Sequence, residues 1–237
     1  MKILALETSA KAVSVAAVEN GSVLASAYQN VGLTHSVTLM PLLDSLLKHA
    51  GLALKDIDCI AVANGPGSFT GLRIGVSAAK GLAWTLDLPC CGVSTLAAMA
   101  QNLSSFDGLI ICAMDARRNQ IYNALFEAKD GSLTRLCPDR AIGLDELAAQ
   151  LNNCKKRKIV VGDGAQLCYN DLKNRGISCE IAPPQLVMQN AVGVGLVACC
   201  MAARGETVSA RDLVPVYLRL SQAERERLAK GLPITLD

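Results

Sequence analysis

Short apolar runs of strand length alternate along the chain with longer segments whose apolar residues recur at helical spacing. The pattern predicts strands at 2–7, 13–19, 23–28, 59–63, 109–115, 120–126 and 158–161. It predicts helices at 35–50, 70–86, 94–103, 144–152, 165–174 and 189–203. Strands and helices that alternate in this way are typical of an α/β protein.

The pattern of the first strands recurs about halfway along the chain. In each half an apolar strand ends in an acid, a second strand follows, and the chain turns again at a glycine. An offset of 108 residues aligns Glu7 with Asp115 and Ala16 with Ala124. Two copies of a three-strand meander with helices are the plan of the actin-like ATPase (ribonuclease H-like) fold, so the repeat predicts two related lobes. Chance similarity of two hairpins is the alternative.

Breaks in the pattern predict the domain organisation. Polar and turn residues at 103–108 separate an N-terminal lobe (1–105) from a C-terminal lobe (106–220), and a charged tail follows at 221–237. The apolar run at 191–203 is shorter than the ~20 residues that span a bilayer, so it predicts a buried helix. The apolar run at the N-terminus is too short for a signal peptide. We therefore expect a cytoplasmic protein with no membrane segment.

The amino-acid composition restricts the possible classes of protein but does not assign a function. The 237 residues are 51% hydrophobic, enough for a sizeable core, and the net charge of +2 does not by itself predict nucleic-acid binding. The ten cysteines include no C-x-x-C pair. We interpret them as reduced, small core residues, with a zinc site as the alternative.

The most distinctive string in the sequence is a glycine-rich loop, GPGSFTGLR, between a predicted strand and a predicted helix. In such a loop the glycines let the backbone approach a ligand, and the N–H groups of the following helix can face an anion. Here Pro66 and Phe69 flank that backbone, so we expect a structural loop, with Phe69 anchored in the core. The loop residues are Gly65, Pro66, Gly67, Ser68, Phe69, Thr70 and Gly71.

This string resembles the signature of the bacterial TsaB (YeaZ) family. Supporting similarity lies in Asp115-Ala116-Arg117, in Gly162-Asp163-Gly164-Ala165 and in Pro215-Val216-Tyr217-Leu218-Arg219, so it extends from residue 1 to about 220. The resemblance implies a non-catalytic accessory subunit in the synthesis of threonylcarbamoyladenosine (t6A) in tRNA. Such a subunit binds and activates TsaD, which transfers the threonylcarbamoyl group to the tRNA adenosine beside the anticodon. The resemblance also implies TsaE in a ternary complex, a homodimer when the chain is alone, and indirect contact with tRNA. It implies no cofactor, with a place for ATP or ADP at the interface of the complex.

The strand-end acids are candidates for remnants of a phosphate site. Glu7, Thr8, Ser9 and Asp115 occupy the turns where an actin-like ATPase holds phosphate and magnesium. The family more often has Asp at the first turn, and Glu7 is one methylene longer. We interpret the turns as vestigial; that they are ordinary strand-end acids is the alternative. The alternative function is a stand-alone ATP-dependent phosphotransferase of this fold, which ATP turnover by the purified chain would reveal.

Histidines are too few for a metal centre of the kind found in TsaD, which binds its metal through a His-x-x-x-His pair. His35 is followed four residues later by Leu39, and His49 is the only other histidine. A zinc ion needs several converging ligands. We therefore expect no metal, no metallopeptidase activity and no catalytic residues.

Two helices predict a surface for a partner. The helices at 35–50 and 70–86 carry apolar residues over more than the single face that one core contact needs. We expect them to form a four-helix bundle with a partner; the alternative is that both faces are covered within the chain. We expect Leu43→Glu or Val76→Glu to leave the fold intact and to break the homodimer and the TsaD complex. The expected interface residues are His35, Leu39, Met40, Leu43, Leu47, Leu72, Arg73, Val76, Ala79, Lys80 and Ala83.

One basic run, Lys155-Lys156-Arg157-Lys158, precedes a predicted strand. We interpret it as a solvated loop, and contact with tRNA phosphates is the alternative.

Overall fold

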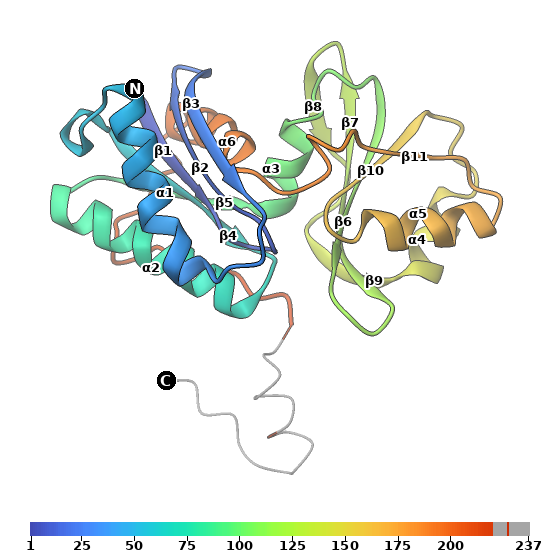
Figure 1. Ribbon diagram of the computed structural model, residues 1–237. Helices are drawn as coiled ribbons and strands as arrows, with labels where there is room; N and C mark the ends of the chain where they lie inside the picture. Colours follow the sequence, from blue (N-terminus) through green and yellow to red (C-terminus); the bar gives the residue numbers. More distant parts are fainter. Residues whose placement is uncertain (220–226, 228–237) are drawn as a thin grey trace.

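The first half of the chain forms a five-stranded mixed sheet. The computed structural model describes residues 1–219 and 227, and Figure 1 shows two sheets with helices around them. The strand order is β3-β2-β1-β4-β5; β2 runs antiparallel to β1, and β4 runs parallel to it. The strands are β1 (Lys2–Glu7), β2 (Val13–Glu19), β3 (Ser22–Gln29), β4 (Cys59–Gly65) and β5 (Cys90–Ser94).

The second half repeats this sheet, which confirms the predicted fold of two related α/β halves. The strand order is β11-β10-β6-β7-β8, with β7 antiparallel to β6, β10 parallel to it, and β9 paired to β7. The strands are β6 (Gly108–Asp115), β7 (Gln120–Lys129), β8 (Ser132–Arg135), β9 (Arg140–Gly143), β10 (Lys158–Val161) and β11 (Glu180–Ile181). The strands that the sequence pattern does not predict are β5, β8, β9 and β11.

Helices cover the outer faces of both sheets and fill the space between them. Helices α1 and α2 pack on the first sheet, α4 and α5 pack on the second, and α3 and α6 lie between the sheets (Figure 1). The helices are α1 (His35–Ala50), α2 (Phe69–Leu86), α3 (Thr95–Gln101), α4 (Leu144–Leu151), α5 (Ala165–Asn174) and α6 (Ala191–Ala203), with a short 3-10 helix at Leu54–Asp56.

Helix α6 is the buried helix that the apolar run predicts. Ala191, Val194 and Ala198 pack against the first sheet, and a Cβ on Gly193 would overlap the carbonyl of Ala98 in α3. No helix in the described part of the chain is long and apolar enough to cross a membrane.

The chain after α6 also returns to the first sheet, where Cys90 and Val208 form an antiparallel bridge. Residues 191–219 therefore do not pack wholly as part of a C-terminal lobe.

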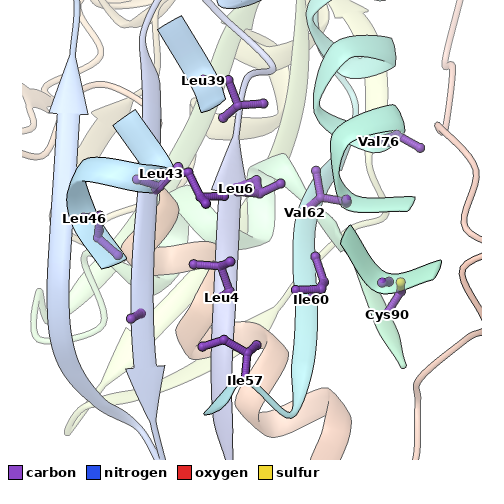
Figure 2. Close-up of a cluster of buried hydrophobic side chains, with 14 of the residues drawn as sticks. Leu4, Leu6, Leu39, Leu43, Leu46, Ile57, Ile60, Val62, Val76 and Cys90 are labelled. Atoms are coloured by element: carbon purple, nitrogen blue, oxygen red, sulfur yellow. The ribbon is translucent and has the colours of Figure 1, made fainter. Parts of the chain in front are cut away.

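The core between α1, α2 and the first sheet corrects the predicted partner surface. Figure 2 shows Leu43 beside Leu6 and Leu39 above β1, with Val76 on the helix next to β4. Seven of the predicted interface residues are at most 7% exposed, because other parts of this chain cover them. They are Leu39, Leu43, Leu47, Leu72, Val76, Ala79 and Ala83. A partner cannot contact these side chains without unfolding the lobe, so their assignment to the interface is wrong.

Candidate functional site

The carboxyl ends of the central strands of both sheets face a cleft between the lobes. In each sheet the first strand and its parallel neighbour end at the same edge, which is where α/β folds bind ligands. The cleft has a volume of about 610 Å³. Its lining comes from residues 9–11, 67–70, 114–117, Tyr122, Asp163 and 216–219.

The glycine-rich loop is packed against the turn that follows β1. The Ser68 amide donates a 2.7 Å hydrogen bond to the Ser9 carbonyl, and the Thr8 hydroxyl donates one of 2.7 Å to the Gly71 carbonyl. A Cβ on Gly71 would overlap the carbonyl oxygen of Thr8, and one on Gly67 would lie 2.5 Å from that of Ser9. The glycines therefore permit a close approach between two backbone segments of this chain.

A side chain at Gly71 is expected to destabilise the fold. Gly71→Ala places a methyl group against the Thr8 backbone, and we expect a loss of about 1–3 kcal/mol of unfolding free energy. The matched control is Gly81→Ala on the same helix, because a Cβ added at Gly81 would meet nothing within 4 Å. This control should stabilise the folded chain by about 1 kcal/mol. Urea denaturation of both variants measures the effect. Equal stabilities of the two variants would contradict this packing.

Glu7 is sealed beneath the loop and does not line the cleft. Its side chain is fully buried, Oε1 accepts a 2.5 Å hydrogen bond from the Ser9 amide, and Oε2 has no partner among the described residues. Burial raises the pKa of Glu7 to about 7, opposed by hydrogen bonds from Ser9 and reinforced by the charge of Asp163. Asp115, by contrast, is exposed at the cleft, where its Oδ1 accepts a hydrogen bond from the Arg117 amide at 2.7 Å.

Asp163 is an acid of the cleft that the strand-end pattern does not single out. Burial also raises its pKa, while Gln189 donates a hydrogen bond of 3.0 Å to Oδ1. Its one signal in the sequence is the glycine-containing turn after β10, which is part of the family resemblance. Burial thus raises the pKa of both acids, Glu7 behind the cleft and Asp163 in its wall, whereas Asp115 is exposed.

The raised pKa of Glu7 predicts a loss of stability as pH rises. The folded-state pKa of about 7 lies above the ordinary value of 4.5, so folding favours the protonated form of Glu7. As the pH rises from 4.5 to about 7, the cost of keeping Glu7 buried therefore increases and the stability of the folded chain falls. The shift corresponds to about 3 kcal/mol. We expect the unfolding free energy of Glu7→Gln, measured relative to that of the native chain, to increase by about that much as the pH rises from 4.5 to about 8. Urea denaturation across this range measures it; a constant difference would show an unshifted Glu7.

Residues 214–219 cross the mouth of the cleft. The Val216 amide donates to the Asn64 carbonyl at 2.7 Å, and Arg219 donates from Nη1 to the Ala116 carbonyl in the other lobe at 2.7 Å. The Tyr217 ring stacks on Phe69 with centroids 4.7 Å apart. Phe69 therefore lies at the cleft mouth, and the expectation that it anchors the loop in the core is wrong.

The remaining predicted interface residues have different contacts and do not form one surface. His35 donates from Nε2 to the Ala10 carbonyl at 2.7 Å and ties α1 to the turn after β1. Arg73 lies 4.0 Å over the Phe69 ring, and Lys80 donates to the carbonyl of Leu213. Met40, which is 45% exposed, is the one apolar member of the predicted set that faces solvent.

An exposed apolar surface does exist on α1 and α2, on the side away from the sheet. Val37 is 64% exposed and Trp84 is 73% exposed, although both are large apolar side chains. Between the two helices lies a groove of about 330 Å³. It is lined by Met40, Leu54, Ala78, Gly81, Leu82, Thr85 and Leu86. We call Val37, Met40, Trp84 and this groove the outer helical face.

Two repeated sheets around a central cleft define an actin-like ATPase fold. Component A of the (R)-2-hydroxyglutaryl-CoA dehydratase of Acidaminococcus fermentans shares this fold, with a TM-score of 0.50 at 13% identity over 86% of this chain and 99% of that one. The family model for TsaD, tRNA N6-adenosine threonylcarbamoyltransferase, matches residues 29–223.

Full-length relatives narrow the class to one family. The tRNA threonylcarbamoyladenosine biosynthesis protein TsaB of Bacillus subtilis is 35% identical over 94% of this chain and 96% of its own length. TsaB of Escherichia coli is 32% identical, with coverages of 92% and 95%. The YeaZ structure from Pseudomonas aeruginosa is 30% identical with a TM-score of 0.78, covering 92% of this chain and 99% of that one. The chain therefore belongs to the TsaB (YeaZ) family of tRNA threonylcarbamoyladenosine biosynthesis proteins.

Proposed function

We propose that this chain is a non-catalytic subunit of the cytoplasmic machinery that forms t6A in tRNA, and that it binds and activates TsaD through the outer helical face. The observation that carries the proposal is the exposure of Trp84. It is the only tryptophan of the chain and 73% of it faces solvent. Tryptophan is enriched among the residues that dominate binding energy in protein interfaces, and an exposed ring beside an apolar groove is typical of such a site.

The outer helical face has the composition of a helix-packing surface. Ala78 and Gly81 line the groove and would let the backbone of a partner helix come close. Asp44 and Lys48, paired at 2.7 Å on α1, supply charged residues on the same helix as Met40. In the absence of TsaD the same face is suited to pair with a second copy around a two-fold axis, as a homodimer.

A subunit of this kind does not need an ATPase centre of its own. Because Glu7 is buried beneath Ser9, its carboxylate cannot reach a metal or a phosphate in the cleft. In this proposal TsaE hydrolyses ATP in the ternary complex, and the role of this chain is to organise TsaD.

We expect the isolated chain to show no ATP turnover above background. An ordinary enzyme turns over about 10 times per second. Phosphate release from the purified chain, compared with Asp115→Ala, measures this. Turnover at that level which Asp115→Ala abolishes would support the stand-alone phosphotransferase instead.

Complex formation tests the proposal. The purified chain is mixed with TsaD from the same organism and passed over a size-exclusion column with light scattering. We expect a heterodimer that forms at the expense of the homodimer. Separate elution of the two proteins at micromolar concentration would contradict the proposed role.

A further inference from the structure

Cationic side chains from four separate segments line the cleft or adjoin the residues that line it. Lys11, Arg117 and Arg219 line the cleft, Arg118 follows directly on the same turn, and Arg73 holds the Tyr217 hydroxyl through a 3.1 Å hydrogen bond from Nε. Within residues 1–219, none of the five has a carboxylate within 4.0 Å. We call these five residues the cationic rim.

The basic run at 155–158 has the opposite character. Lys156 pairs with Glu127 at 2.5 Å and Arg157 with Glu180 at 2.5 Å. Lys158 is 7% exposed and donates to the carbonyls of Cys154 and Lys156. This leaves Lys155 as the one side chain of the run without a partner in the described part of the chain. Two cations of the run therefore pair with carboxylates and a third is buried against carbonyls. Among residues 1–219 no cation of the rim pairs with a carboxylate, and only Arg73 and Arg219 have a neutral partner, the Tyr217 hydroxyl and the Ala116 carbonyl.

The turn that carries two of the rim arginines has an unusual backbone. Arg117, Arg118 and Asn119 have φ values of +62°, +57° and +55°, a region that costs non-glycine residues about 1 kcal/mol or more each. The turn is held by the Asp115 carboxylate, which accepts from the Arg117 amide, and by Arg219, which donates to the Ala116 carbonyl. Strain of this kind persists where the surrounding contacts fix it, and it is concentrated at functional sites.

An aromatic platform lies within the rim. The Tyr217 ring is 39% exposed, lines the cleft and is supported from behind by Phe69, which in turn carries the Arg73 guanidinium at 4.0 Å. Unpaired cations that surround a supported aromatic ring are the combination that binds single-stranded nucleic acid. The cations contact phosphates, and the ring stacks on an unpaired base.

We propose that the cationic rim and Tyr217 bind the RNA substrate directly, as a single-stranded loop. The rim cations contact the backbone, and Tyr217 stacks on an unpaired base. The choice of RNA rests on the proposed function, since t6A is made in tRNA. Arg73 and Arg118 do not line the cleft, so the rim extends beyond the surface that one mononucleotide in the cleft would contact.

The test compares two triple variants that remove the same charge. Lys11→Gln/Arg117→Gln/Arg118→Gln removes three rim cations, and Lys55→Gln/Lys129→Gln/Lys155→Gln removes three exposed cations elsewhere. Fluorescence anisotropy with an anticodon stem-loop RNA is measured from about 50 to about 300 mM salt. We expect the rim variant to bind about tenfold or more weakly and to lower the salt slope by about 2, and the control to change little. Tyr217→Leu should weaken binding about fivefold, and Tyr217→Phe should not.

The same preparations are tested for TsaD binding, which separates this proposal from the previous one. Loss of RNA binding in the rim variant with TsaD binding intact would support direct RNA contact. No RNA binding by the native chain, equal losses in both triple variants, or displacement of the RNA by millimolar ATP would overturn it, whatever the outcome with TsaD. Failure of the native chain to bind TsaD while the rim still binds RNA would overturn the accessory role alone.

Discussion

Leu43→Glu is expected to unfold the chain. Leu43 is 3% exposed and packs in the core between α1 and the first sheet, beside Leu6 (Figure 2). The substitution removes a packed leucine, which costs about 2–5 kcal/mol, and buries a carboxylate that has no partner. A loss of this size is comparable to the whole stability of a typical domain, about 5–15 kcal/mol.

The matched control is Met40→Glu, three residues earlier on the same helix and 45% exposed. Thermal denaturation followed by circular dichroism should show a cooperative transition near that of the native chain for Met40→Glu and none for Leu43→Glu. Val76→Glu, at 3% exposure, should behave as Leu43→Glu does. A folded Leu43→Glu protein with a native Tm would contradict the burial of Leu43, and would mean that α1 is rotated about its axis relative to this structure.

Met40→Glu combined with Trp84→Ala is expected to abolish partner binding while the fold stays intact. Both residues are exposed, so little packing within the chain is lost. At an interface the truncation of a central tryptophan costs about 2 kcal/mol or more, and a carboxylate in the apolar groove adds a desolvation cost. We expect both the TsaD complex and the homodimer to weaken by about a hundredfold or more.

Leu136→Glu is the control for this pair, because Leu136 is 47% exposed but lies between β8 and β9 in the other lobe. It should bind TsaD as the native chain does. Light scattering of the mixtures, with circular dichroism to verify folding, decides the outcome. A folded double variant that still forms both complexes would show that the outer helical face is not the docking surface.

The architecture can be predicted because it is encoded in local patterns. The apolar strands and the acid-turn-strand repeat recur in both halves, and these elements carry the sheet topology. The strands that escape prediction are short or lack alternation: β5 contains Gly92 between cysteine and valine, and β11 has two residues. Their positions depend on pairing with β4 and β10, which no local pattern reveals.

The sites are less predictable because they depend on contacts distant in sequence. A helical wheel indicates that α1 and α2 carry apolar residues on more than one side, but it cannot tell which side faces the chain's own sheet. Phe69 meets Tyr217 only through the return of the chain after α6, and Arg219 meets Ala116 in the same way. The environment of Glu7 likewise depends on the loop that closes over Ser9 from another segment.

Formation of t6A in a reconstituted reaction shows directly whether TsaD depends on this chain and on its outer helical face. Purified TsaD and TsaE, ATP, threonylcarbamoyl-adenylate and an unmodified tRNA transcript are incubated with the native chain, with no added chain, with Met40→Glu/Trp84→Ala, or with Leu136→Glu. The modified nucleoside is then measured by mass spectrometry. We predict t6A with the native chain and with Leu136→Glu, and only background without the chain or with the double variant. Equal t6A formation in all four reactions would contradict the accessory role.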